Sequence, residues 1–157
     1  MIFPALHREV RVPQSLSNVI LHVVFGTRHR VPCLIKPVRQ HLFPYMATLV
    51  RNAGSECYRV GGIEDHVHLA IRLNRTETIA NLVQGVKSGS SKWLKTQSPH
   101  LRDFAWQGGY AAFSVGYKGL DTLIAYIDGQ ETHHAGTRSA AWIRSFEDEY
   151  RALMQEH

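Results

Sequence analysis

The chain has 157 residues, 44% of them hydrophobic, and its 18 lysines and arginines exceed its 13 acidic residues, for a net charge of +5 at pH 7. This length suits a single domain with a substantial core. No apolar run approaches transmembrane length and the first residues lack the regions of a signal peptide, so we expect a cytoplasmic protein. Cys33 and Cys57 lack metal-ligand spacing and are expected to be reduced thiols. The basic balance favours a polyanionic partner.

The predicted elements follow a regular order. Residues 1–17 contain two prolines and no clear period, and we expect an irregular lead-in there, before a single domain over residues 18–157. Sequence patterns predict strands at residues 19–27, 56–63, 66–73 and 110–117, and helices at residues 36–53, 76–97, 120–134 and 140–155. This order predicts an α+β fold, a ferredoxin-like (RRM-like) split βαββαβ antiparallel sheet with helices on one face plus C-terminal helices. In that topology the first and third strands are central neighbours.

Two histidines lie one residue apart in the third predicted strand. Successive side chains of a strand point to opposite faces, so His66 and His68 project together while Val67 and Leu69 enter the core. Two neighbouring imidazoles can share a divalent cation. The alternative is a pair of polar residues on the open face of a half-buried sheet. His22, on the first strand, could approach the pair, but its apolar neighbours favour a structural role.

The helix predicted at residues 120–134 has an apolar stripe and a polar edge beside it. The stripe consists of Leu120, Leu123, Ile124 and Ile127. Tyr126 and Gln130 lie one turn apart on the adjacent edge, and His133 continues the row. A phenol at the boundary of a core is common. Beside a two-histidine strand in a basic protein, however, it is a candidate nucleophile.

These side chains match the needs of phosphodiester cleavage. An ordinary phenol, with a pKa of about 10, is mostly protonated at neutral pH and attacks an anionic phosphodiester poorly. A divalent cation held by His66, His68 and Gln130 would polarise a phosphate oxygen and offset developing charge. Tyr126 could then attack phosphorus and form a phosphotyrosine, and reversal with a different hydroxyl would rejoin DNA without ATP. No general base is obvious in the sequence.

Several motifs, taken in their order, resemble one family. His66-Val67-His68 is a His-hydrophobic-His motif, and residues 126–130, Tyr-Ile-Asp-Gly-Gln, form a Tyr-x-x-x-Gln helix motif. The strand at residues 22–30 (HVVFGTRHR) and residues 104–110 (FAWQGGY) also fit. Over nearly its whole length the chain resembles the single-tyrosine HUH transposases of small bacterial insertion sequences, the insertion sequence 200-like family.

The resemblance implies a transposase that cleaves and rejoins single-stranded DNA at hairpins of the element's ends, leaving a 5′-phosphotyrosine and a free 3′-hydroxyl. Tyr126 would be the nucleophile, and His66, His68 and Gln130 would be the ligands of Mg²⁺ or Mn²⁺. Nitrogen donors favour Mn²⁺ of the two. Family members act as homodimers with shared active sites, in which the histidines of one subunit meet the tyrosine and glutamine of its partner. Residues 18–157 would form one HUH transposase domain.

Some residues depart from the usual pattern of this family. Gly129 stands where many relatives carry Asn, and a glycine inside a helix destabilises it by about 1 kcal/mol relative to alanine. Tyr117, near the end of the fourth strand, is the alternative nucleophile, although no Gln follows it one turn later. Asp65 precedes His66 and points the opposite way in a regular strand, so we expect a role in the turn rather than metal ligation.

Two basic clusters are candidate DNA contacts. Lys87, Lys92 and Lys95 lie on the second predicted helix, and Arg28 and Arg30 follow the first strand. Such cations suit the phosphates of a hairpin stem. The alternative for each residue is a solvated surface without a partner.

Two other functions remain open on the sequence alone. A non-catalytic module that binds hairpin nucleic acid would need exposed aromatic residues on central strands, where this chain has histidines. A domesticated relative that processes repeated hairpins for its host would share the chemistry of the transposase.

Overall fold

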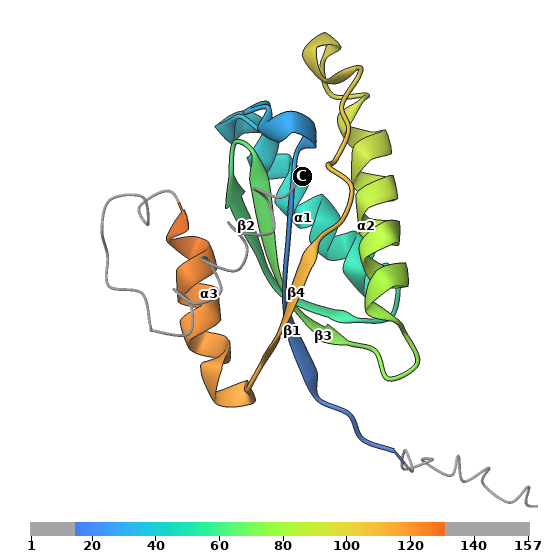
Figure 1. Ribbon diagram of the computed structural model, residues 1–157, viewed down its shortest axis with the longest axis vertical. Coiled ribbons are helices and arrows are strands. Elements are labelled where there is room, and N and C mark those ends of the chain that lie inside the picture. The colour runs from blue at the N-terminus through green and yellow to red at the C-terminus, as the bar shows by residue number, and fades with distance from the viewer. Residues whose placement is uncertain (1–14, 131–157) are drawn as a thin grey trace, which may run out of the picture.

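The computed structural model describes residues 15–130, which form one four-stranded sheet and three helices (Figure 1). The elements are β1 (Val19–Gly26), α1 (Lys36–Asn52), β2 (Glu56–Ile63), β3 (His66–Leu73), α2 (Ile79–Leu94), β4 (Ala111–Val115) and α3 (Leu120–Asp128). Short 3-10 turns lie at Arg28–Arg30, Pro99–Leu101 and Tyr117–Gly119. The predicted strands and the first two helices are present, with small shifts at their ends. Most of the lead-in and the helix expected at residues 140–155 lie outside the described residues.

The sheet is antiparallel throughout and its strand order is β2-β3-β1-β4. The prediction that the first and third strands are central neighbours is therefore confirmed, as is the α+β class. The register pairs Gly26 with His66, Val24 with His68 and His22 with Ala70. Because opposite and diagonal side chains of paired strands interact, this register brings His22 beside His68.

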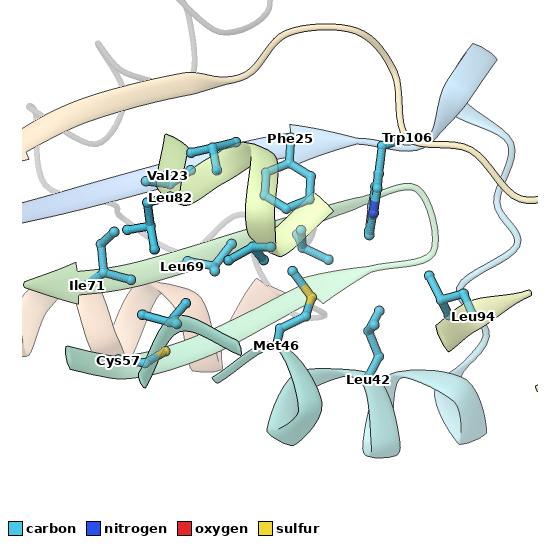
Figure 2. Packing of buried hydrophobic residues seen from close by; sticks show 14 of the residues in the cluster. Val23, Phe25, Leu42, Met46, Cys57, Leu69, Ile71, Leu82, Leu94 and Trp106 are labelled. Carbon is cyan, nitrogen blue, oxygen red and sulfur yellow. The ribbon is translucent and has the colours of Figure 1, made fainter. Parts of the chain in front are cut away.

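One face of the sheet is covered by α1 and α2 and holds the main hydrophobic core (Figures 1 and 2). The strand alternation places Val23, Phe25, Leu69 and Ile71 on this face, where Figure 2 shows them pointing toward the helices. The helices contribute side chains at helical spacing, Leu42, Met46 and Val50 from α1 and Leu82, Val83 and Val86 from α2. The prediction that Val67 and Leu69 enter the core is confirmed.

The opposite face of the sheet carries the histidines and is covered by α3 (Figure 1). The expectation of helices on one face thus holds for α1 and α2, whereas α3 packs on the other face against β2 and β3. Leu123, Tyr126 and Ile127 of this helix form a small second core with Ala70. No helix within residues 15–130 has the length and hydropathy to cross a membrane.

Gly61 of β2 allows α3 to lie this close to the sheet. A Cβ at this position would stand 2.5 Å from Ile127 Cγ2 and 2.8 Å from the Ile127 carbonyl oxygen. Real Cβ atoms do not approach other atoms so closely. A side chain at Gly61 would therefore push the helix away from the strand.

The sequence predicts that Gly129 lies inside the helix, but the structure places it at the helix end. Regular α3 ends at Asp128, and Gly129 is its C-cap, with its N–H donating to the carbonyl of Ala125 at 3.0 Å. Glycine is well suited to a helix end, where the backbone leaves the helical geometry. The cost that a glycine brings to a helix interior does not apply at this position.

Candidate active site

His66 and His68 share the face of β3 that is turned toward α3, as strand alternation predicted. Both are buried, with 8% and 2% of their surface exposed, and their ring centroids are 5.0 Å apart. The alternative of two polar residues on an open sheet face is therefore excluded by their burial. Two imidazoles are held together beneath a helix.

Each of these imidazoles is oriented through its Nδ1 atom. His68 Nδ1 lies 2.8 Å from His22 Nε2, and His66 Nδ1 lies 2.7 Å from Asp65 Oδ1. Metal-ligating histidines are commonly fixed in this way, with one ring nitrogen bonded to a second group and the other turned to the ion. In both residues Nε2 is thus the candidate ligand atom.

His22, for which apolar neighbours suggested a structural role, lies within hydrogen-bond distance of His68. Burial lowers the pKa of His22 to about 3, so the ring is neutral at physiological pH. If His68 ligates through Nε2, its Nδ1 carries the proton and donates it to His22 Nε2. In that case His22 would hold His68 in the tautomer that a metal requires.

Asp65 lies in the turn between β2 and β3, as expected, but its carboxylate has a second task. Oδ1 accepts from His66, and Oδ2 forms an ion pair with Arg30 Nε at 3.3 Å. The hydrogen bond from His66, helped by the charge of Arg30, lowers the pKa of Asp65, while burial opposes the shift. The carboxylate is therefore ionised and can fix the ring of His66. Strand alternation missed this contact because it does not apply to a turn residue.

Tyr126 is the tyrosine that packs against the histidines. It is 4% exposed, and its ring meets that of His68 edge-on at 5.5 Å and that of His22 at 6.0 Å. Tyr117, the alternative nucleophile, is 68% exposed and lies in the turn before α3. One chain thus brings the helix tyrosine to the histidine strand.

Gln130, the third predicted ligand, is buried at the end of α3, and its amide nitrogen is turned toward its own helix. Nε2 donates to the carbonyl of Tyr126 at 3.4 Å, which is long for such a bond. A bond this weak would be exchanged readily for a stronger interaction with a cation or a substrate. His133 lies outside the described residues.

The donor set fits a divalent cation. Two imidazoles, each hydrogen-bonded through Nδ1, and the carboxamide of Gln130 would provide neutral ligands of the kind that Mn²⁺ and Mg²⁺ sites include. Within residues 15–130 no group of three or more His, Cys, Asp and Glu side chains is arranged to hold a metal ion. A cation bound by His66 and His68 would therefore depend on Gln130 and on oxygen atoms of a substrate.

The five candidate DNA contacts have different surroundings. Lys92 and Lys95 are exposed on and just after α2, and Arg28 is exposed after β1. Arg30 is half-buried in its ion pair with Asp65. Lys87 donates to the carbonyls of Gln107 at 2.6 Å and Gly109 at 2.9 Å, so its ammonium ties α2 to the loop before β4.

Comparison with known proteins places this geometry in context. A family model described as "Transposase IS200 like" matches residues 15–130. The chain is 22% identical over 114 residues to the ISDra2 transposase TnpA of Deinococcus radiodurans, an alignment that covers 69% of this chain and 81% of that protein.

Two solved structures share the fold. A protein from Deinococcus radiodurans R1 assigned as a transposase superposes with a TM-score of 0.60 at 20% identity, covering 74% of this chain and 94% of its own. A REP-associated tyrosine transposase bound to a REP hairpin superposes with a TM-score of 0.58 at 14% identity, covering 76% and 70%.

The described residues therefore have the fold of a transposase, with a histidine pair and a tyrosine helix on the face of the sheet opposite α1 and α2. The family match spans most of the sequence, and the chain belongs to the IS200-like transposase family.

Proposed function

We propose that this protein cleaves and rejoins single-stranded DNA at the ends of an insertion sequence, with Tyr126 as the nucleophile. The observation that carries the proposal is the packing of the Tyr126 ring against the rings of His68 and His22 in a single chain. In the reaction the phenol oxygen of Tyr126 would form a bond to phosphorus while the bond from phosphorus to the 3′-oxygen breaks. The products are a 5′-phosphotyrosine and a free 3′-hydroxyl.

His66, His68 and Gln130 would hold the divalent cation, Mg²⁺ or Mn²⁺, which when bound offsets negative charge on the phosphate. Asp65 and His22 fix the two imidazoles and thereby define where the phosphate can lie. His22 is a poor general base for the phenol proton, since its pKa of about 3 lies far below neutral pH. His22 is therefore not the acceptor of the Tyr126 proton.

The substrate would include DNA hairpins. A solved structure with the same fold is of a transposase bound to a REP hairpin, and this chain carries a net charge of +5. Three of the five predicted phosphate contacts, Lys92, Lys95 and Arg28, are exposed, whereas Lys87 and Arg30 also make contacts within the protein. The second candidate remains a domesticated relative that applies the same chemistry to repeated hairpins of its host.

The homodimer with active sites shared between subunits is an expectation from the family resemblance, and the packing within one chain favours a different arrangement of the site. Within one chain, Tyr126 already lies against His68, so a partner is not required to bring these two groups together. We therefore propose that the described arrangement represents an active site formed in cis. Exchange of α3 between subunits would place the same groups in trans.

The decisive experiment is a cleavage assay on single-stranded hairpin DNA from the flanks of the gene, with Mn²⁺. Wild type should form a metal-dependent covalent adduct with the 5′ phosphate of the downstream product. Tyr126→Phe should form none, and Tyr117→Phe should form as much as wild type. An adduct that persists in Tyr126→Phe but not in Tyr117→Phe would reverse the assignment. Hairpin binding without any adduct would indicate a binding module.

A further inference from the structure

A cavity of about 210 Å³ lies where β1 ends and the chain turns toward α1. Its floor is apolar, with Leu101 and Phe104 buried beneath it and Cys33 at its side. Its rim is polar and carries charges of both signs, because Arg28, His29 and Asp103 are exposed beside it. An apolar floor under a hydrogen-bonding rim is typical of a site for a small flat ligand.

The rim is held in one conformation. His29 and Arg30 both have left-handed backbone angles, with φ of 57° and 55°, which side chains other than glycine adopt rarely. Hydrogen bonds on both sides fix this turn: Arg28 N–H donates to the Ala105 carbonyl at 2.9 Å, and Thr27 Oγ1 donates to the Val31 carbonyl at 2.8 Å. The cavity is therefore formed before a ligand arrives.

One wall of the cavity is next to residues of the candidate active site. Thr27 lines it, and Thr27 N–H donates to the carbonyl of Asp65 at 2.9 Å. The carboxylate of Asp65 orients His66, and Arg30 of the same turn pairs with that carboxylate. A group in the cavity is thus separated from the histidine pair by the residues that position the pair.

We propose that this cavity receives one unpaired nucleobase of the single-stranded substrate, from a nucleotide close to the scissile phosphate. Single-stranded nucleic acid is recognised by inserting bases against apolar and aromatic groups while cations contact the backbone. Phe104 and Leu101 provide the apolar surface, and His29 can stack on the base or bond its edge. Arg28 is exposed at the rim, where the phosphate of the same nucleotide would pass. The proposal rests on the proposed function, since it needs a single-stranded DNA substrate.

Cys33 offers a direct test that does not depend on catalysis. Oligonucleotides would carry a thiol tether, as an activated disulfide, on one base at a time around the cleavage position. We expect the Tyr126→Phe protein, without metal, to form a disulfide with the tether at one nucleotide position and not at the others. Cys33→Ser should abolish this crosslink, because the second cysteine, Cys57, is buried on β2 in the main core.

A second experiment measures specificity in the cleaving enzyme. Replacing that nucleotide by an abasic site should reduce cleavage by wild type about tenfold, the range expected for loss of one stacked base. His100 also lines the cavity. The rim variant His29→Gly, in which glycine accepts the left-handed angle, combined with His100→Ala should be insensitive to the abasic site. His41→Ala, an exposed histidine on α1, is the control and should keep the sensitivity of wild type.

The outcomes separate this proposal from the proposed function. Crosslinking at one position without cleavage would support the cavity and contradict the cleavage chemistry. If the protein cleaves DNA but crosslinks equally at all positions or at none, the base-binding role of the cavity is contradicted and the cleavage chemistry is not. The same conclusion follows if the rim variant is as sensitive to the abasic site as wild type. A protein that binds no single-stranded DNA would overturn both.

Discussion

His22 Nε2 and His68 Nδ1 lie 2.8 Å apart in a buried hydrogen bond that joins the two central strands of the sheet. The bond is diagonal in the register, since His22 pairs with Ala70 and His68 with Val24. A ligand histidine whose second nitrogen is bonded keeps one tautomer and one ring orientation. We therefore propose that His22 is a positioning residue for the proposed metal site.

Replacement of His22 should therefore weaken metal binding. His22→Phe fills the site but cannot accept the hydrogen bond from His68, and we expect the affinity for Mn²⁺ to fall by about 10- to 100-fold. Titration calorimetry of Mn²⁺ into the protein bound to hairpin DNA, with Tyr126→Phe added to prevent cleavage, measures this directly. His22→Asn, whose carboxamide oxygen can accept the bond, should recover part of the affinity. Unchanged Mn²⁺ affinity in both variants would show that His22 only fills space.

The parts of the site that follow from chain periodicity were predictable. A period of two puts His66 and His68 on one face, and the helical wheel sets Tyr126 beside the apolar stripe that ends at Ile127. Both predictions depend only on local geometry, and the structure confirms the shared face and the packing of Tyr126. Such predictions remain valid in the folded protein because the period of a strand or helix fixes the direction in which each side chain points.

The contacts that depend on register or on turns were not predictable in the same way. The bond between His22 and His68 requires the offset of β1 against β3, which no single strand contains. The carboxylate of Asp65 reaches His66 because the turn breaks the alternation expected of a strand. Gly129 became a cap rather than an interior residue because regular α3 ends at Asp128.

The contact between Gly61 and Ile127 should control the position of the tyrosine helix. In Gly61→Ala the new Cβ would stand 2.5 Å from Ile127 Cγ2, so α3 must move away from β2. Overpacking of this kind destabilises by about 1–3 kcal/mol, and cleavage should fall because Tyr126 shifts with its helix. Thermal unfolding and adduct formation measure the two effects.

Gly85→Ala is the matched control for this helix displacement. Gly85 lies on the exposed side of α2, and a Cβ added there would have no other atom within 4 Å. Alanine should therefore stabilise the helix by about 0.5–1 kcal/mol and leave cleavage unchanged. If the Gly61→Ala protein were as stable and active as wild type, the close contact between Gly61 and Ile127 would not determine the position of α3.

The Cys57 thiol should make stability depend on pH in the alkaline range. Burial raises the pKa of Cys57 from 9.0 to about 11. The unfolded chain therefore loses the thiol proton first, and the contribution of the thiol to stability is complete below pH 9 and is lost as the pH rises through 11. The loss amounts to about 3 kcal/mol in the free energy of unfolding.

Denaturant unfolding between about pH 8 and 11 tests this dependence. Cys57→Ala should show a shallower decline than wild type over that range, whatever its stability at the lower pH. Cys33→Ala is the control and should keep most of the slope, because Cys33 is only partly buried. Parallel declines in wild type and Cys57→Ala would contradict the role of this thiol.

Lys87 and Lys92 lie on the same helix but should respond differently to replacement by methionine. Lys87→Met removes the donor to two carbonyls and should lower stability by about 1–3 kcal/mol. Lys92→Met should leave the melting temperature unchanged but reduce hairpin affinity and the slope of its salt dependence by about one phosphate contact. Thermal melts and binding titrations over a range of salt distinguish the two. If Lys87→Met reduced the salt dependence of hairpin binding without loss of stability, Lys87 would be a phosphate contact and not a structural residue.

Mixing two inactive variants determines whether the site works within one chain. Tyr126→Phe keeps the histidines, and His68→Ala keeps the tyrosine. Since Tyr126 packs against His68 of its own chain, we expect a mixture of the two proteins to remain inactive at every ratio. Adduct formation on hairpin DNA with Mn²⁺ is the readout, and co-expression of the two variants ensures that any dimers are mixed. Recovery of the adduct on the His68→Ala chain alone would show that Tyr126 acts on a phosphate held by the partner, and would establish shared sites in a dimer.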